Sequence, residues 1–205
     1  MSKRNINFSI IFRILGSLLF IESFFLLLSL LVSLIYNDGD AKAFLYTLIG
    51  ALSIGVISRF FTNNKDTNIG KREGFIIVSS VWVVFSFIGS LPFIIHGSIP
   101  GLTNAFFETI SGFTTTGSSV LNDIESLPHG LLFWRSIIQW MGGMGIIVLS
   151  LAILPILGIG GMQLFSAEVP GPVTDKLHPR VKETAKRLWL IYVIFTVTET
   201  ILLVI

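Results

Sequence analysis

The segment Gly112–Ser119 has the sequence GFTTTGSS and places three consecutive threonines and a glycine within an otherwise apolar chain. Hydroxyl groups and backbone carbonyls are oxygen ligands, and glycine permits backbone dihedral angles that turn successive carbonyls in one direction. Rings of such carbonyls can replace the hydration shell of an alkali cation. The candidate cation ligands are Thr114, Thr115, Thr116, Gly117 and Ser118. The same residues would also suit an ordinary surface turn.

The residues before this segment predict a short helix. After the turn at Pro100 and Gly101, Thr103 or Asn104 can cap a helix over about residues 103–113. Its length of roughly 16 Å is about half the thickness of the hydrocarbon core of a bilayer. A helix that ends inside the membrane exposes carbonyl groups, and its dipole favours a cation at that end.

The composition places these residues in a membrane protein. Apolar residues make up 52% of the 205, charged residues only 13%, and the mean hydropathy is +0.83, which is too apolar for a soluble domain of this length. The net charge of +2 and the scattered basic residues give no groove for nucleic acid. There are no cysteines, and the histidines show no metal-ligand spacing with carboxylates. No catalytic constellation or cofactor site is expected.

Runs of about 17 to 25 apolar residues can cross a bilayer as helices, and the sequence has five of them. The predicted spans are Phe8–Tyr36, Ala43–Phe61, Gly74–Ile95, Leu131–Leu157 and Leu188–Ile205. The first run has a basic lead-in like a signal peptide, but it is about twice the usual apolar length and no cleavage site follows. We therefore interpret it as a retained span, and the fold class as an all-α integral membrane protein.

The basic residues predict the orientation of the spans, because Lys and Arg concentrate on the cytoplasmic side. They precede or begin the first span, and they recur between the second and third spans and between the fourth and fifth. The other two connections hold only Lys42 and Arg135. The N terminus is therefore expected inside, and the connection from His96 to Gly130 outside, in a multi-pass membrane protein.

Three stretches resemble a known family. FFETISGFTTTGSSV corresponds to its short helix and filter, RSIIQWMGGMGIIVLSLAILPILGIGGMQLFSAEVPGP to the following span and connector, and GSLPF to the close of the span before. On these residues the chain resembles the Trk/Ktr/HKT superfamily of potassium transporters, specifically the N-terminal part of the Trk-type membrane subunit. The resemblance runs from about Arg72 to Arg187.

The resemblance implies four linked membrane-pore-membrane repeats around a pseudo-fourfold axis. This chain would supply an N-terminal hairpin over residues 1–70, a first repeat over 71–160 with its pore helix at about 103–113 and its filter at 114–118, a cytoplasmic connector over 161–187, and the first span of a second repeat over 188–205. It would thus be a fragment with one filter wall. The backbone of residues 114–118 would bind K⁺, with Thr115 and Thr116 as metal ligands.

The same resemblance implies potassium uptake without a cofactor, a homodimer of the full-length protein, and a cytoplasmic nucleotide-binding regulatory subunit of the TrkA type. Whether uptake is symport or channel-like stays open. Serine in place of the filter glycine tends to accompany sodium transport in the family, so Gly117 favours potassium. The alternatives are a sodium-conducting relative and a non-conducting membrane scaffold.

Several other polar residues have open roles. Glu108 could attract cations or hydrogen-bond the filter backbone from behind, and Asp123 and Glu125 could concentrate cations or simply be solvated. Glu22 lies too deep in the first span to reach the near interface easily, and we expect it to make an interhelical hydrogen bond rather than conduct ions. Glu199 presents the same choice. The glycines of MGGMG suit close helix packing or a hinge.

Overall fold

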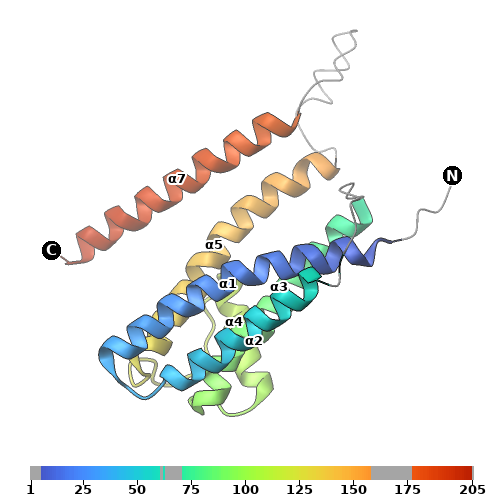
Figure 1. Cartoon of the computed structure of the whole chain (residues 1–205). Coiled ribbons are helices and arrows are strands. Elements are labelled where there is room, and N and C mark those ends of the chain that lie inside the picture. The colour runs from blue at the N-terminus through green and yellow to red at the C-terminus, as the bar shows by residue number, and fades with distance from the viewer. Residues whose placement is uncertain (1–5, 61, 63–70, 158–176, 205) are drawn as a thin grey trace, which may run out of the picture. The chain divides into compact units, whose positions relative to one another are not determined.

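The computed structural model describes residues 6–60, 62, 71–157 and 177–204, and these residues form helices joined by turns. The helices are α1 (Phe8–Tyr36), α2 (Ala41–Phe60), α3 (Lys71–His96), α4 (Leu102–Phe113), α5 (His129–Leu157) and α7 (Leu177–Val204). The chain divides at Gly142 into two compact units, so α5 begins in the first unit and ends in the second. The chain is shown in Figure 1. The prediction of an all-α membrane protein is confirmed.

Among the described residues, three helices are long and apolar enough to cross a membrane: α1, α2 and α3. They match the first three predicted spans with shifts of a few residues at their ends. α5 and α7 contain the fourth and fifth predicted spans and have 29 and 28 residues, which is sufficient length. Their roles as spans, and the division of the chain into repeats, stay predictions.

The first two helices form a close antiparallel pair (Figure 1). A Cβ atom added to Gly16 of α1 would lie 2.8 Å from Ser58 and 3.1 Å from the Gly55 carbonyl oxygen of α2. The Ser58 hydroxyl donates to the Phe12 carbonyl at 2.5 Å. Small residues permit this close approach. In a membrane, apolar surfaces gain little by moving from lipid to protein, so helix pairs are stabilised chiefly by close van der Waals packing and by hydrogen bonds between helices.

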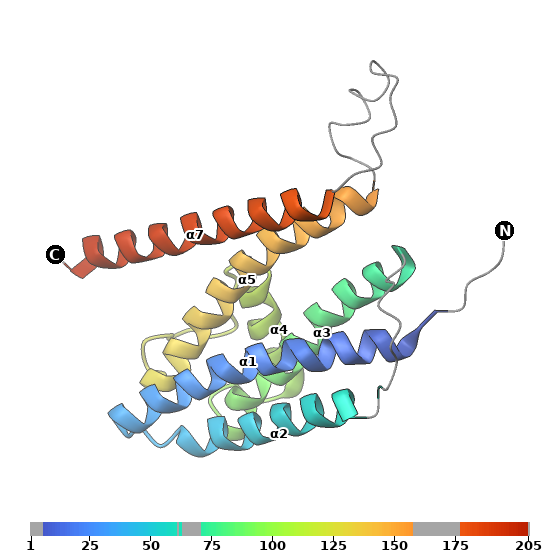
Figure 2. The same cartoon turned by 45° about the horizontal axis from the view of Figure 1, so that its top comes forward.

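The core of the first unit gathers side chains from α1 to α5. Figure 2 shows these helices in a second view. Trp134 of α5 is fully buried against Phe44 of α2, with ring centroids 6.4 Å apart. Its indole nitrogen donates to the Gly89 carbonyl of α3 at 2.9 Å, so this aromatic side chain satisfies its one donor while buried. Trp134 therefore links the N-terminal hairpin to the helices around α4.

Two carboxylates in the α1–α2 loop cap the start of α5. Asp38 accepts a hydrogen bond from the His129 backbone nitrogen at 3.0 Å, and Asp40 accepts one from the Leu131 backbone nitrogen at 3.1 Å. The Ser33 hydroxyl also donates to Asp40. These bonds satisfy N–H groups that a helix start leaves free, and negative charge is favourable there. They explain why α5 begins before the predicted Leu131.

The Asp38 contact is expected to respond to pH. Two hydrogen bonds, from the His129 backbone and then from its Nδ1 at 2.6 Å, hold the pKa of Asp38 below its ordinary value. Because the pKa of Asp38 is lower in the folded state than in the unfolded state, the contact stabilises the fold at pH values above the pKa of an ordinary aspartate. This stabilisation is lost as the pH falls through the folded-state pKa of Asp38. The protection of the amides at the start of α5, measured as the ratio of the intrinsic to the observed hydrogen-exchange rate at each pH, should fall on acidification. In Asp38→Asn this acid response should be absent, while a persisting response would assign it to another group.

The second unit holds the end of α5 and α7. The Trp189 indole nitrogen lies 2.6 Å from the Met144 sulfur, and a Cβ atom added to Gly143 would lie 2.6 Å from the Tyr192 hydroxyl. α7 begins at Leu177, whereas the fifth span was predicted only from Leu188. Residues 177–187 are thus helical, and Pro179 is compatible because it lies in the first turn, where backbone N–H groups have no helical acceptor. Residues 161–176 of the predicted connector lie outside the described residues.

Candidate ion site

The short helix α4 ends at the segment that the sequence singles out. Its twelve residues, Leu102–Phe113, follow a cap at Gly101, whose φ of 88° suits glycine. The predicted side-chain cap was wrong: Thr103 and Asn104 lie inside the helix, and the Asn104 amide instead donates to the Pro100 carbonyl at 3.4 Å. The helix itself lies where it was predicted. Ala105, Glu108, Thr109, Ser111 and Phe113 are its buried residues.

The three threonines begin with a turn. The backbone nitrogens of Thr114, Thr115 and Thr116 donate back to α4, to the carbonyls of Ile110, Gly112 and Ser111, each at 2.9 Å. Thr115 has a φ of 55°, in the left-handed region. A threonine rarely adopts this conformation because it is β-branched. The N–H groups of this segment are therefore occupied by the helix end, and the chain reverses there.

The carbonyl oxygens of the same segment are available. Residues 114–118 are exposed, and within the described residues none of the hydrogen bonds ends on a carbonyl of residues 114–117. Gly117 has a φ of 76°, and a Cβ atom added there would meet nothing within 4 Å. The backbone at Gly117 therefore requires glycine for its dihedral angle and not for lack of space.

Hydroxyl groups hold the shape of the segment. Ser111 of α4 donates to the Ser118 carbonyl at 2.6 Å. The Thr114 hydroxyl donates to the Ile110 carbonyl at 2.8 Å and lies 2.8 Å from the Thr116 hydroxyl. These side chains brace the turn from within, so the free oxygens that remain for a cation are chiefly those of the backbone.

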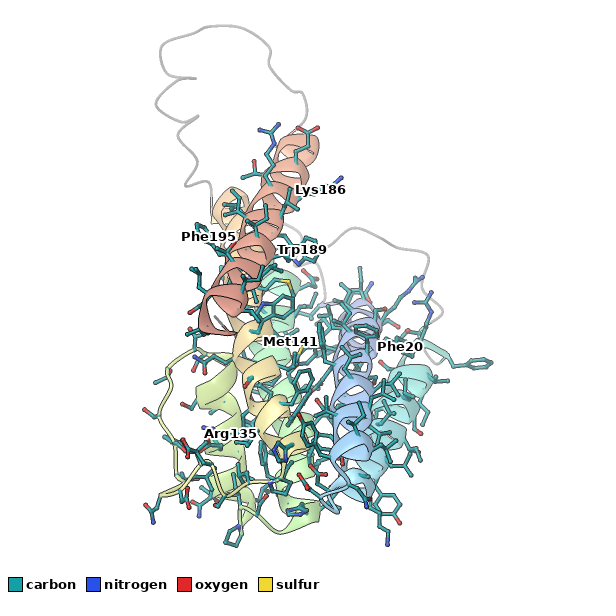
Figure 3. All side chains as sticks on the ribbon, turned by 90° about the vertical axis from the view of Figure 1, so that its left-hand side faces the viewer. Phe20, Arg135, Met141, Lys186, Trp189 and Phe195 are labelled. Carbon is teal, nitrogen blue, oxygen red and sulfur yellow. The ribbon has the colours of Figure 1, made fainter. Side chains whose placement is uncertain are left out.

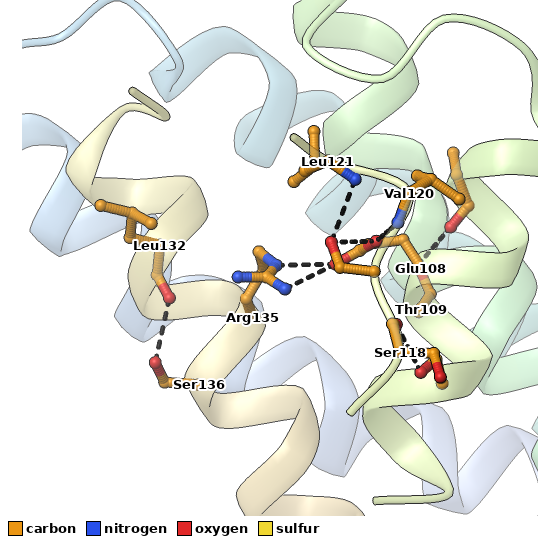
Figure 4. A network of polar contacts seen from close by, with 11 residues as sticks. Glu108, Thr109, Ser118, Val120, Leu121, Leu132, Arg135 and Ser136 are labelled. Carbon is orange, nitrogen blue, oxygen red and sulfur yellow. Dashed lines mark hydrogen bonds and ion pairs between the residues drawn. The ribbon is translucent and has the colours of Figure 1, made fainter. Parts of the chain in front are cut away.

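Glu108 connects the returning chain to α5, as Figure 4 shows. Its side chain accepts hydrogen bonds from the Ser119 hydroxyl at 2.9 Å and from the Val120 backbone nitrogen at 2.9 Å. Arg135 donates to it from Nε at 2.9 Å and from Nη2 at 2.6 Å. Of the two roles that the sequence left open for Glu108, the structure places it behind the segment, where it holds the two residues that follow Ser118.

A polar cavity of about 100 Å³ lies beside this network. Gly117 and Ser118 line it from the returning chain, Glu108 and Ser111 from α4, and Arg135 from α5. Arg135 is the guanidinium group that neutralises Glu108, and the side-chain exposures of the two are 23% and 3%. A buried carboxylate needs such a partner. The positive charge of Arg135 on α5 therefore allows Glu108 to lie buried directly behind residues 114–118.

We expect Glu108→Gln to destabilise the protein by about 1.5–3 kcal/mol, the range for a hydrogen bond to a charged group. The amide keeps the size of the side chain but removes the charge that binds Arg135. Thermal unfolding in detergent measures the loss. Arg135→Gln should cost less in the Glu108→Gln background than alone, because the two side chains act together. The control is Asp123→Asn, which changes an exposed acid of the same loop; equal effects of both acids would contradict the pairing.

α5 also approaches the end of α4 very closely. A Cβ atom at Gly142 would overlap the backbone carbonyl of Phe113, the last residue of α4. A Cβ atom at Gly112 would lie 2.8 Å from Ile138 of α5. Of the MGGMG glycines, Gly142 therefore has the packing role, which is one of the two predicted roles. Its contact with Phe113 fixes the end of α4, and residues 114–118, the threonine segment, follow directly from there.

Side chains of the site that the sequence analysis missed come from distant parts of the chain. Arg135 was noted only as a charge near the start of a span, and Ser111 and Ser119 were not considered. One feature of the sequence could have predicted the pairing of Glu108 with Arg135: each is an isolated charged residue in one of two apolar helices that follow one another along the chain. Figure 3 shows Arg135 on α5 within the first unit.

The expected interhelical hydrogen bond of Glu22 was wrong. The Glu22 side chain is fully buried, and neither of its carboxyl oxygens has a hydrogen-bond partner among the described residues.

The long apolar helices, with a short helix and a carbonyl-rich turn between two of them, define the class of an all-helical membrane protein. The chain belongs to the TrkH family of cation transport proteins, whose sequence profile matches residues 40–205. It is therefore a member of a transport family and not an enzyme.

Known relatives and a solved structure agree with this assignment. The chain is 52% identical over 194 residues to the Trk system potassium uptake protein TrkH of Salmonella typhimurium, covering 93% of this chain and 40% of the relative. It is 39% identical to TrkG of Escherichia coli, covering 86% and 37%. The crystal structure of the potassium transporter TrkH from Vibrio parahaemolyticus matches with a TM-score of 0.80 and 41% identity, covering 94% and 38%. The chain thus spans about 40% of the length of the curated relatives.

Proposed function

We propose that this chain contributes to potassium uptake across the cytoplasmic membrane, and that residues 114–118 form one wall of a backbone-carbonyl selectivity filter. The observation that carries the proposal is the turn at the end of α4, where the backbone N–H groups are occupied and the carbonyls of residues 114–117 are free. The carbonyl end of a helix carries about half a negative charge. Thr115 and Thr116 are the proposed potassium ligands within this wall.

The names of the relatives support potassium as the ion. The Salmonella typhimurium relative is named a potassium uptake protein, and the Vibrio parahaemolyticus structure a potassium transporter. A single wall cannot enclose a dehydrated ion, because selectivity filters are rings of carbonyls. We therefore propose the predicted organisation: a hairpin over residues 1–70, a first repeat over 71–160, a connector over 161–187, and the start of a second repeat over 188–205, with further walls completing the ring.

The proposed partners follow from the same organisation. They are K⁺, the lipid bilayer, a second copy of the full-length protein and a cytoplasmic nucleotide-binding regulatory subunit of the TrkA type. Ion flux tests the central proposal. The complete gene product that carries this segment, reconstituted in liposomes with a potassium gradient, should pass K⁺ faster than Na⁺. Equal rates for the two ions would favour a sodium-conducting relative, and no flux of either with and without the regulatory subunit would favour a scaffold.

The proposed orientation can be tested by labelling single cysteines, because the chain has none of its own. The predicted N terminus inside places residues 63–72 inside and residues 97–130 outside. A membrane-impermeant thiol reagent added to intact cells should label Ser126→Cys, which is exposed. It should label Lys65→Cys only after the cells are permeabilised. Labelling of position 65 in intact cells would contradict the orientation.

A further inference from the structure

A carboxyl group without a partner is buried where three helices meet. Glu22 belongs to the buried face of α1, between Leu19 and Leu26, and its exposed fraction is 0%. A Cβ atom built on Gly89 of α3 would lie 3.4 Å from Glu22 Oε1 and 2.9 Å from Thr109 of α4. Gly89 is therefore the point where the absence of a side chain admits both the acid of α1 and the short helix.

No described group compensates a negative charge on Glu22. Neither of its oxygens has a hydrogen-bond partner among the described residues. Glu108 of α4 and Arg135 of α5 bind each other. The ionisable residues of α3, namely Lys71, Arg72, Glu73 and His96, lie at the two ends of that helix. Ser86, one turn before Gly89, is also buried with its hydroxyl unpartnered.

The position next to α4 adds a second penalty for a charged Glu22. The Cβ built on Gly89 would also lie 3.3 Å from the ring of Phe113, the last residue of α4. A helix carries partial negative charge at this end, so an ionised carboxylate here would be repelled as well as desolvated. Burying an unpaired carboxylate costs so much that such a group neutralises instead.

We propose that Glu22 is a proton-binding site: the folded protein keeps it as a neutral carboxylic acid in the contact between α1, α3 and the end of α4. The ligand is a proton. This inference depends only on the packing of the first unit and would hold whatever ion the protein carries. Binding the proton lets α1 pack against Gly89 of α3, beside the end of α4, without placing a charge there.

Infrared spectroscopy of the purified chain in lipid vesicles tests the proposal directly. At neutral pH, the difference between wild type and Glu22→Gln should show loss of the carbonyl stretch of a protonated carboxyl group. The control Glu125→Gln changes an exposed acid and should show loss of carboxylate bands. Should Glu22→Gln fail to fold, Glu22→Met, of similar size and apolar, gives the same comparison. Loss of carboxylate bands from either Glu22 variant would overturn the proposal.

Stability as a function of pH gives a second readout. If Glu22 is neutral when folded and ionised when unfolded, the unfolded state binds fewer protons, so stability falls as pH rises above the ordinary range of a glutamate. Relative to Glu22→Gln, the folding equilibrium constant of the wild type should fall as pH rises above the ordinary range of a glutamate, by at most about tenfold per pH unit. Parallel curves for the two proteins would show that Glu22 has the same charge in both states and would overturn the proposal.

Discussion

Gly142→Ala is expected to destabilise the protein even though alanine favours helices over glycine by about 1 kcal/mol. The added methyl group would overlap the carbonyl of Phe113 at the end of α4, and an obstacle made of backbone cannot move aside as a side chain can. Overpacking of this kind costs about 1–3 kcal/mol. We expect a net loss in that range, measured by unfolding in detergent. In the complete gene product, the proposed potassium uptake should also fall, because residues 114–118 directly follow Phe113.

Gly50→Ala is the matched control for this effect. Gly50 also lies inside a helix, α2, and a Cβ atom there would meet nothing within 4 Å. The alanine should therefore be neutral or stabilise the protein by up to about 1 kcal/mol. If Gly142→Ala were as stable and as active as Gly50→Ala, α5 would not pack against the end of α4 as described.

The helices could be predicted from the sequence because each long apolar run is a local property of the chain. Their ends were less predictable, since some depend on distant residues. α5 begins at His129 because Asp38 and Asp40, in the loop between α1 and α2, bind its first backbone nitrogens. No local pattern around residue 129 contains that information. α7 begins at Leu177, before the predicted span from Leu188, and Pro179 does not prevent this because the first turn of a helix tolerates proline.

The threonine segment was found for a similar reason, since its oxygen-rich residues are consecutive. What holds it in place was only partly visible. Glu108 was considered, but its bonds to Ser119, Val120 and Arg135 depend on how the chain returns from α4 and meets α5. The reversal of the chain after α4 was not predicted, because it depends on bonds from the backbone N–H groups of residues 114–116 to the last turn of the helix. Helix ends attract such bonds because they leave carbonyls free.

Glu22 shows the limit of reasoning from chemical type alone. A carboxyl group in the middle of an apolar helix was expected to find a hydrogen-bond donor on a neighbouring helix. The neighbour is Gly89, which has no side chain that could donate a hydrogen bond. The sequence could predict that Glu22 needs compensation but not that the helix facing it would offer glycine.

Gly117→Ser is expected to weaken the preference for potassium over sodium in the complete gene product while leaving the protein folded. Gly117 has a φ of 76°, where a residue with a side chain pays about 1–2 kcal/mol. The site has room for the serine, since a Cβ atom there would meet nothing within 4 Å. The strain should therefore be relieved by rotation of the backbone, which turns the carbonyls that the filter presents to the ion. With one wall of the ring altered, selectivity should fall rather than vanish.

The measurement is uptake of potassium and of sodium in cells that lack other potassium uptake systems, with the amount of protein in the membrane fraction determined in parallel. Gly97→Ser is the matched control. Gly97 has a φ of 83° and equally open surroundings, but it lies in the turn after α3. Both variants carry the same backbone strain, so only Gly117→Ser should change the ratio of the two ions. If the two variants reach the membrane equally and transport with the same unaltered preference for potassium, Gly117 does not face the ion and residues 114–118 are not the filter.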